Sequence, residues 1–170
     1  TGPNSARADL FHQRRGSGPV IDRGNGVSFQ AASNRYFTGT AKHVWAIDAS
    51  SGDRVQVASS PQHLSFPYGM TVVGSDLYVI NQGGSGQASL TQVNLSTGAT
   101  SFTSRVGGAG SGHDLDGVTA VDRGLDDSHV FISQMNNETP NQIAELVKVD
   151  LGNGERTLVW SPTETNVSFK

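Results

Sequence analysis

The sequence contains no cysteine among its 170 residues, which excludes disulfide bonds and thiolate metal sites. Charged side chains make up only 16% of it, and the formal net charge is −3. A chain with this balance has no basic field that would attract nucleic acid or an anionic membrane. No apolar run approaches the roughly 18 residues that a membrane-spanning helix needs. We therefore expect neither nucleic acid nor a membrane as a partner.

Glycine is abundant, with 21 residues, while hydrophobic residues make up 35% of the chain. This balance is typical of short strands joined by tight turns, because glycine adopts the positive φ angles that such turns need. With 170 residues, the chain has the length of one domain and can bury a sizeable core. The composition therefore predicts an all-β domain.

Two short motifs occur three times along the chain. The copies of the first are 25–28, 68–71 and 116–119, and those of the second are 47–52, 93–98 and 149–154. The shared glycines of the first motif, Gly26, Gly69 and Gly117, are 43 and 48 residues apart. A repeat of this length is one unit that buries its apolar face against its neighbours.

Each copy contains four short apolar segments, which predicts a four-stranded antiparallel meander. The predicted strands are 26–29, 35–37, 44–47 and 54–57, then 70–73, 77–80, 90–93 and 100–102, then 118–121, 130–132, 146–149 and 157–160. The copies span about 18–60, 61–105 and 112–162, with tails at 1–17 and 163–170. Five aromatic residues on these strands are expected to pack between the sheets, namely Tyr36, Trp45, Tyr78, Phe131 and Trp160.

A four-stranded unit of roughly 40 to 50 residues is the size of one β-propeller blade. A β-sandwich of many short strands also fits the turn spacing, but it gives no reason for one motif to recur in phase. The motifs resemble those of the six-bladed propellers that include SMP-30/gluconolactonase-like, NHL-repeat and virginiamycin B lyase-like proteins. The segment 44–52 is also similar to the quinoprotein propeller repeat. This resemblance covers about residues 18–162.

Three blades are too few to close a propeller ring, since propellers typically have about four to eight. An open arc leaves sheet edges and apolar blade faces exposed, which invites another chain. We therefore expect half of a six-bladed propeller. It would be completed either by a second copy, as a homodimer, or by blades that this sequence does not contain.

The richest polar segment, 107–117, contains His113, Asp114 and Asp116 just before a predicted inner strand. One hypothesis is a divalent cation such as calcium on Asp114 and Asp116, with Asp116 and His113 as catalytic groups, because oxygen and nitrogen ligands suit such ions. The alternative is a loop whose two aspartates accept hydrogen bonds from backbone N–H groups in turns. Aligning the first motif places Asn25 and Tyr68 at the positions that match Asp116, so we expect all three at one mouth of the channel.

In SMP-30-like enzymes, a Glu, an Asn and an Asp at the starts of inner strands hold the metal. Asp116 matches the Asp of that pattern, whereas the first copy reads Gly24, Asn25, Gly26 and has no Glu. The resemblance implies a metal-assisted hydrolase of lactonase-like type, or a lyase-like enzyme, that acts at a polar site in the channel.

Asn81 and Asn136 lie near the ends of the second predicted strands of their copies and could present carboxamides to a small-molecule or carbohydrate ligand. On this basis the alternative function is a non-catalytic carbohydrate- or protein-binding scaffold. A third interpretation is an inactive fragment of a larger propeller protein. The start at Thr1 and three N-x-Ser/Thr sequons, at Asn94, Asn137 and Asn166, favour an extracellular or periplasmic protein.

Overall fold

The computed structural model describes residues 16–82, 88–136 and 143–162. These residues form three four-stranded antiparallel sheets, each with its strands in sequence order. Blade 1 comprises β1 (Asn25–Gln30), β2 (Arg35–Thr40), β3 (His43–Asp48) and β4 (Arg54–Ser59). Blade 2 comprises β5 (Pro67–Val73), β6 (Asp76–Asn81), β7 (Ser89–Asn94) and β8 (Thr100–Arg105). Blade 3 comprises β9 (Val118–Arg123), β10 (His129–Asn136), β11 (Ile143–Asp150) and β12 (Arg156–Trp160). The predicted all-β fold class is confirmed.

The same turn joins the third and fourth strands of every blade. Its first residue, Asp48, Asn94 or Asp150, accepts hydrogen bonds on Oδ1 from the backbone N–H groups two and three residues later, at 2.8 to 3.1 Å. The turn ends on a glycine with a φ of 78°, 71° or 73°, a conformation that costs other residues energy. The second repeated motif of the sequence is therefore this turn.

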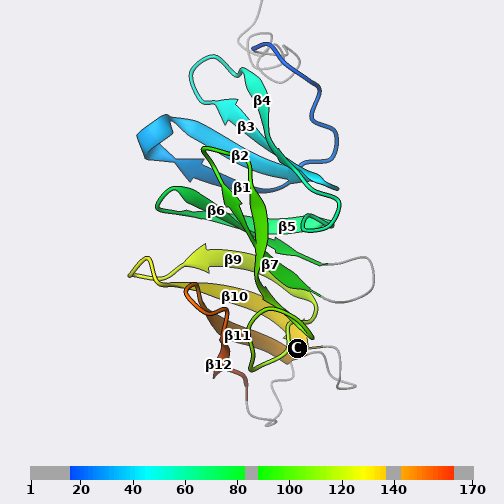
Figure 1. Cartoon of the computed structure of the whole chain (residues 1–170), viewed down its shortest axis with the longest axis vertical. Coiled ribbons are helices and arrows are strands. Elements are labelled where there is room, and N and C mark those ends of the chain that lie inside the picture. Colours follow the sequence, from blue (N-terminus) through cyan, green and yellow to red (C-terminus); the bar gives the residue numbers. More distant parts are fainter. Residues whose placement is uncertain (1–15, 83–87, 137–142, 163–170) are drawn as a thin grey trace, which may run out of the picture.

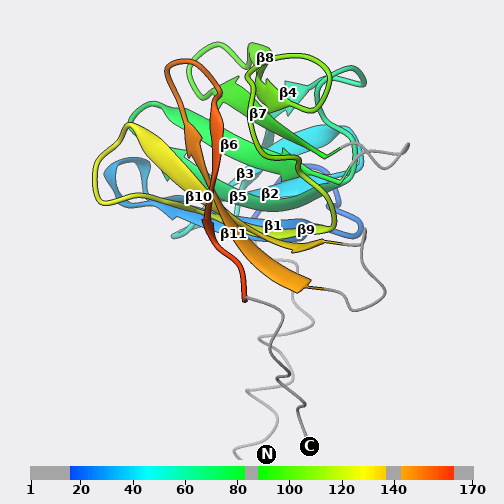
Figure 2. The same cartoon turned by 90° about the horizontal axis from the view of Figure 1, so that it is seen from below.

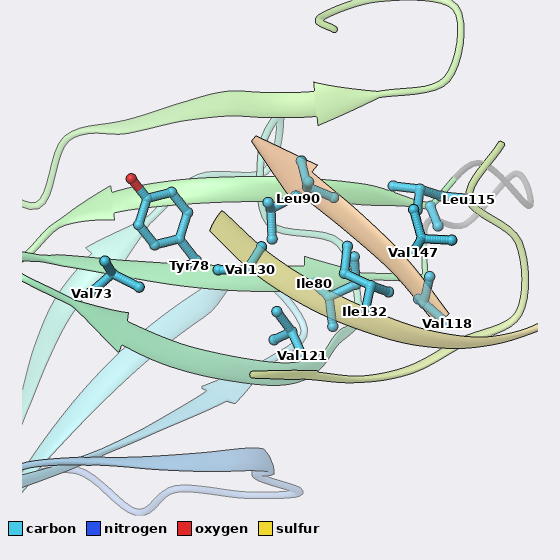
Figure 3. Close-up of a cluster of buried hydrophobic side chains, with 12 residues drawn as sticks. Val73, Tyr78, Ile80, Leu90, Leu115, Val118, Val121, Val130, Ile132 and Val147 are labelled. Atoms are coloured by element: carbon cyan, nitrogen blue, oxygen red, sulfur yellow. The ribbon is translucent and has the colours of Figure 1, made fainter. Parts of the chain in front are cut away.

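The three blades lie side by side in the order of the sequence (Figure 1), and the inner strand β5 lies beside both β1 and β9. Apolar side chains fill both junctions. Between blades 1 and 2 they include Phe37, Val44, Leu77 and Val79. Between blades 2 and 3 they include Ile80, Leu90, Ile132 and Val147 (Figure 3). Burial of these side chains is the main stabilisation of the stack, since no blade can cover its own faces.

The expectation that all five aromatic residues pack between blades is only partly correct. Tyr78 is buried in the junction of blades 2 and 3, whereas Tyr36 and Trp160 are exposed. Both exposed residues lie on the terminal blades, which within residues 16–82, 88–136 and 143–162 have a neighbouring blade on one side only. The described part of the chain contains no helix long and apolar enough to cross a membrane.

Candidate functional site

The connector between blades 2 and 3 runs along the start of β12 before it reaches β9. The Arg156 N–H donates to Ser111 O at 2.8 Å, and the His113 N–H donates to Arg156 O at 3.1 Å. The guanidinium of Arg156 also donates, to His113 O at 2.5 Å and to Ser104 Oγ at 2.7 Å. Burial lowers the pKa of Arg156, and the negative charge of Asp114 opposes that shift. Arg156 thus ties the connector to both blades.

The side chain of His113 is held by a buried carboxylate. His113 Nε2 lies 2.9 Å from Glu145 Oε2, and the same oxygen accepts a hydrogen bond from Gln134 Nε2 at 2.9 Å. Glu145 and Gln134 are both buried, while the His113 side chain is 26% exposed. The imidazole therefore stands between a buried acid and the solvent.

Gln134 also binds the backbone of the connector. Its Nε2 donates to Asp114 O at 3.1 Å, and its Oε1 accepts from the Asp116 N–H at 3.3 Å. Pairing of β10 with β11 places Gln134 directly opposite Glu145, so the two side chains share one face of the sheet. The sheet register therefore brings the acid, the carboxamide and the histidine-bearing connector together.

This arrangement is chemically suited to proton transfer. A carboxylate that binds one nitrogen of an imidazole fixes the orientation of the ring and stabilises its protonated form. Burying a carboxylate is costly unless it is paired and hydrogen-bonded, and Glu145 has both His113 and Gln134 as partners. The register position that Glu145 holds in blade 3 is occupied in blade 2 by Ser89, opposite Asn81, so the blade architecture does not require an acid there.

Glu145 and Gln134 were missed by the sequence analysis, although the sequence contained a signal. Glu145 lies in phase with Val147 and Val149, which are buried on one face of β11. In a strand of period two, that phase places the carboxylate on the core face. A charged residue in such a position indicates a paired or functional group.

Asp114 and Asp116 do not gather further metal ligands around them. Among the described residues, no group of three or more His, Cys, Asp or Glu side chains is arranged to hold a metal ion. The backbone groups of both aspartates bind Gln134, and His113 binds Glu145. The divalent-cation site on Asp114 and Asp116 thus stays a prediction.

The predicted match between Asp116, Tyr68 and Asn25 is wrong in register. In β5, Tyr68 is the extra residue of a bulge and comes directly before the Gly69–Ile80 pair. In β9, Thr119 is the extra residue of a bulge and comes directly before the Ala120–Ser133 pair. Thr119, not Asp116, is therefore the counterpart of Tyr68. Core residues on β9 and β10 set this register, and they outweigh the similarity of the short motif. Asn25 and Tyr68 do lie in neighbouring segments, since a Cβ added to Gly26 would be 3.0 Å from Tyr68 O.

The two predicted carboxamides differ in their surroundings. Asn81 is buried, and its Nδ2 donates to His63 O at 3.1 Å and to Thr91 Oγ1 at 3.0 Å. Its Oδ1 accepts from the Ser65 N–H at 3.2 Å, so Asn81 holds the preceding connector and is not placed to meet a ligand from solvent. Asn136 is the last residue of β10, and its side chain lies outside the described part, as do residues 83–87 and 137–142.

A groove of about 530 Å³ runs along the inner strands of all three blades. Its polar groups include Ser28, Thr71 and Asp122, and its aromatic groups are Phe29 and Phe131. Grooves of this size accommodate small ligands. Hydroxyl, carboxylate and aromatic groups together suit a polar ligand with apolar faces, such as a sugar.

No protein-family model matches this sequence, and no curated protein sequence matches it. Solved structures do match it. A chain of the nidogen/laminin complex has a TM-score of 0.64 and 8% identity, and the match covers 82% of this chain and 49% of that one. The fold is propeller-like.

Two enzyme structures show the same likeness. The PQQ-bound aldose sugar dehydrogenase of Streptomyces coelicolor matches with a TM-score of 0.56 and 10% identity, over 82% of this chain and 47% of that one. An oligogalacturonate lyase in complex with manganese matches with a TM-score of 0.55 and 13% identity, over 81% and 40%. The chain therefore spans about half or less of the length of these propeller proteins. At such identities, the likeness concerns the fold alone.

Proposed function

We propose that this chain supplies a proton-transfer site to a propeller of hydrolase or lyase type, with His113 as the acid–base group and Glu145 as its positioning residue. The observation that carries the proposal is the 2.9 Å contact between the part-exposed imidazole and a buried carboxylate. Blade 2 builds the corresponding junction with Ser89 and Asn81, so a buried acid is more than the fold needs. Natural proteins depart from such local requirements mainly at functional sites.

In this mechanism, the ring nitrogen of His113 that does not contact Glu145 accepts a proton from a substrate or from water. The carboxylate of Glu145 stabilises the imidazolium that forms, and the ring then returns the proton to the leaving group. Gln134 holds Glu145 in place, so the orientation of the ring does not depend on solvent. General acid–base catalysis of this kind contributes about 100-fold to 10,000-fold in rate.

A carbohydrate is the substrate class that we propose. The groove along the inner strands carries the hydroxyls of Ser28 and Thr71 and the carboxylate of Asp122. His113 does not line this groove, so the proposal requires an oligosaccharide long enough to reach from the groove to His113. Two proteins of similar fold act on carbohydrates by their names, an aldose sugar dehydrogenase and an oligogalacturonate lyase. Both observations support the choice, and neither identifies a particular sugar.

The test is turnover of a panel of sugar lactones, aryl glycosides and uronate oligosaccharides by the wild type and by His113→Gln and Glu145→Gln. We expect both variants to lose at least about 100-fold in kcat/KM. The control is His129→Gln, because the His129 side chain is also 26% exposed and also contacts carboxylates, Asp126 and Asp150. Equal activity in all four proteins, or inactivity of the wild type on the whole panel, would overturn the proposal.

The second candidate function is non-catalytic binding of a carbohydrate in the groove, which its polar lining of Ser28, Thr71 and Asp122 favours. Isothermal titration with oligosaccharides tests it. We expect Asp122→Asn to weaken binding about tenfold, because a hydrogen bond to a charged group is stronger than one to a neutral group, and Asp127→Asn, outside the groove, to leave it unchanged. Binding that survives in His113→Gln without any turnover would favour this function over catalysis.

Two further hypotheses come from the sequence alone. A divalent cation such as calcium on Asp114 and Asp116 predicts a calcium-dependent rise in melting temperature that Asp116→Asn abolishes. An extracellular or periplasmic location predicts recovery of the native protein from the culture medium or the periplasm.

A further inference from the structure

Each of the two terminal blades presents an apolar face that the described residues leave uncovered. The first end face, on blade 1, contains Val27, Phe29, Tyr36, Trp45 and Ile47, which the strand pairings place on one side of the sheet. The second end face, on blade 3, contains Phe131, Leu146 and Trp160. Figure 2, which views the molecule from below, shows β10 and β11 of blade 3 in front of the other sheets, so no described strand lies beyond them.

Residues at the same register position show how unusual the first end face is. One register position of the inner strand is held in blades 1, 2 and 3 by Val27, Met70 and Val121, respectively. Met70 and Val121 are 4% and 8% exposed, because the preceding blade covers them, whereas Val27 is 67% exposed. The first end face thus has the position of a junction face without the blade that would cover it.

On the second end face, too, residues are more exposed than their counterparts in blade 2. Phe131 and Leu146 hold in blade 3 the register positions of Tyr78 and Leu90 in blade 2. Tyr78 and Leu90 are buried against blade 3, while Phe131 and Leu146 are only half-buried and the neighbouring Trp160 is 54% exposed. Large apolar faces of this kind mark interaction surfaces.

The segment before blade 1 has the conformation of a connector between blades. Gly16, Ser17 and Gly18 run along β4 as Gly110, Ser111 and Gly112 run along β12. The Arg54 N–H donates to Ser17 O at 2.9 Å, and the Arg156 N–H donates to Ser111 O at 2.8 Å. The segment at 110–112 arrives from a preceding blade. The matching conformation at 16–18 indicates that blade 1 is shaped to receive one as well.

We propose that the first end face of one chain binds the second end face of a second copy, so that two chains close a six-bladed ring. Within each chain, two junctions already join a face like the first end face to a face like the second. The partner of each end face must therefore present an apolar face of the other kind, which a second copy does. Two copies give six blades, within the range of about four to eight that closed propellers use, whereas three copies would give nine. A two-fold dimer also covers both end faces of both chains at once.

The contacts between blades within one chain show which residues would meet where two chains join. A Cβ added to Gly39 of blade 1 would lie 2.6 Å from Pro67 Cβ and 3.1 Å from Met70 Cε of blade 2. By register, Ser133 is the counterpart of Gly39, and Val27 is the counterpart of Met70. Ser133 of one chain therefore lies close to Val27 of the second copy.

The first experiment is the molar mass of the full chain by light scattering. We expect about twice the 17.9 kDa of one chain, and the mass of one chain for Val27→Glu and for Trp160→Glu. Leu125→Glu, at a fully exposed position outside both end faces, serves as the control and stays dimeric. Mixing the first two variants should restore part of the dimer, because the mixed pair keeps one junction without a substitution.

The second experiment does not depend on destabilising variants. The chain has no cysteine, so Val27→Cys with Ser133→Cys provides the only thiols for a short bismaleimide. We expect a covalent dimer from the double variant and from an equal mixture of the two single variants, but not from either single variant alone. A wild-type monomer at the highest soluble concentration, or a mass that grows continuously with concentration, would overturn the proposal. The ring does not depend on the catalytic role of His113, so the two can fail separately.

Discussion

Asn81 and Gln134 occupy the same register position in successive blades and bind the arriving connector in the same way. Asn81 binds His63 O and the Ser65 N–H, and Gln134 binds Asp114 O and the Asp116 N–H. In both cases one carboxamide binds a carbonyl and the N–H two residues later, which helps to satisfy the backbone groups of the connector. The connectors differ in length and sequence, but the blades hold them by one device.

Replacing Asn81 by alanine should therefore destabilise the protein. Asn81→Ala removes the acceptor of the Ser65 N–H, whereas His63 O keeps the Thr91 hydroxyl as a donor. An unsatisfied buried group costs about 1 to 3 kcal/mol. We expect a loss of about 2 kcal/mol in the free energy of unfolding, measured by urea denaturation. Gln62→Ala, at an exposed position of the same connector, should change it by less than about 0.5 kcal/mol. Equal effects in the two variants would contradict the role of Asn81.

Glu145→Leu separates function from stability. The variant removes one partner of the His113–Glu145 pair, which is strongly destabilising where the remaining partner is a buried charge. Here the remaining partner, His113, is 26% exposed and reaches solvent, and Gln134 keeps its bond to Asp114 O. We expect the free energy of unfolding to stay within about 1 kcal/mol of the wild type, while the activity attributed to His113 is lost. A loss of more than about 3 kcal/mol would mean that Glu145 serves the fold and would weaken the proposed function.

Gly110 and Gly107 form a matched pair for testing the path of the connector. Both have positive φ angles, of 74° and 69°, so alanine costs about 1 kcal/mol at either position. A Cβ at Gly110 would collide with the carbonyl of Gly154, whereas nothing lies within 4 Å of a Cβ at Gly107. Gly110→Ala should lose about 2 kcal/mol more than Gly107→Ala in thermal or urea unfolding. Similar losses would show that the connector does not approach Gly154 closely.

The lowered pKa of Asp126 predicts that the stability of the folded protein depends on pH in the acidic range. The Ser128 hydroxyl at 2.6 Å, and then His129, lower the pKa of Asp126 from 3.8 to about 2. Since the folded protein has the lower pKa, the stabilisation is present above about pH 4 and is lost as the pH falls through about 2. The melting temperature of the wild type should exceed that of Asp126→Asn near neutral pH, and the difference should shrink toward zero near pH 2. A difference independent of pH would exclude the carboxylate as its source.

Much of the fold follows from local patterns in the sequence. All twelve predicted strands fall within the observed ones, because alternating apolar residues and turn residues act over a few positions. The turn that begins at Asp48, Asn94 and Asp150 depends on one side chain and one glycine, and it recurs wherever both are present. The start of β9 did not follow the same rule. Its motif resembles that of β5, yet pairing with β10 shifts the register by three residues.

The candidate site could be predicted only in part. His113 lies in the predicted polar segment, but its partner is Glu145, 32 residues later. That contact exists because the pairing of β10 and β11 sets Glu145 opposite Gln134, and the connector is folded back onto the same face. Asn81 was predicted from its place after a strand to bind a ligand, and the structure shows it buried against His63 and Thr91.

The sequence by itself determined the all-β class, the three repeats, the strands and the turns, since each depends on residues close together in the chain. Only the tertiary structure decided which residues of different segments meet. It paired His113 with Glu145, turned Asn81 inward, separated Asp116 from the counterparts of Tyr68, and left Val27 and Trp160 exposed at opposite ends of the stack. The reason is that sheet register and the packing of one blade on the next are set by core contacts far apart in sequence, which no local pattern encodes.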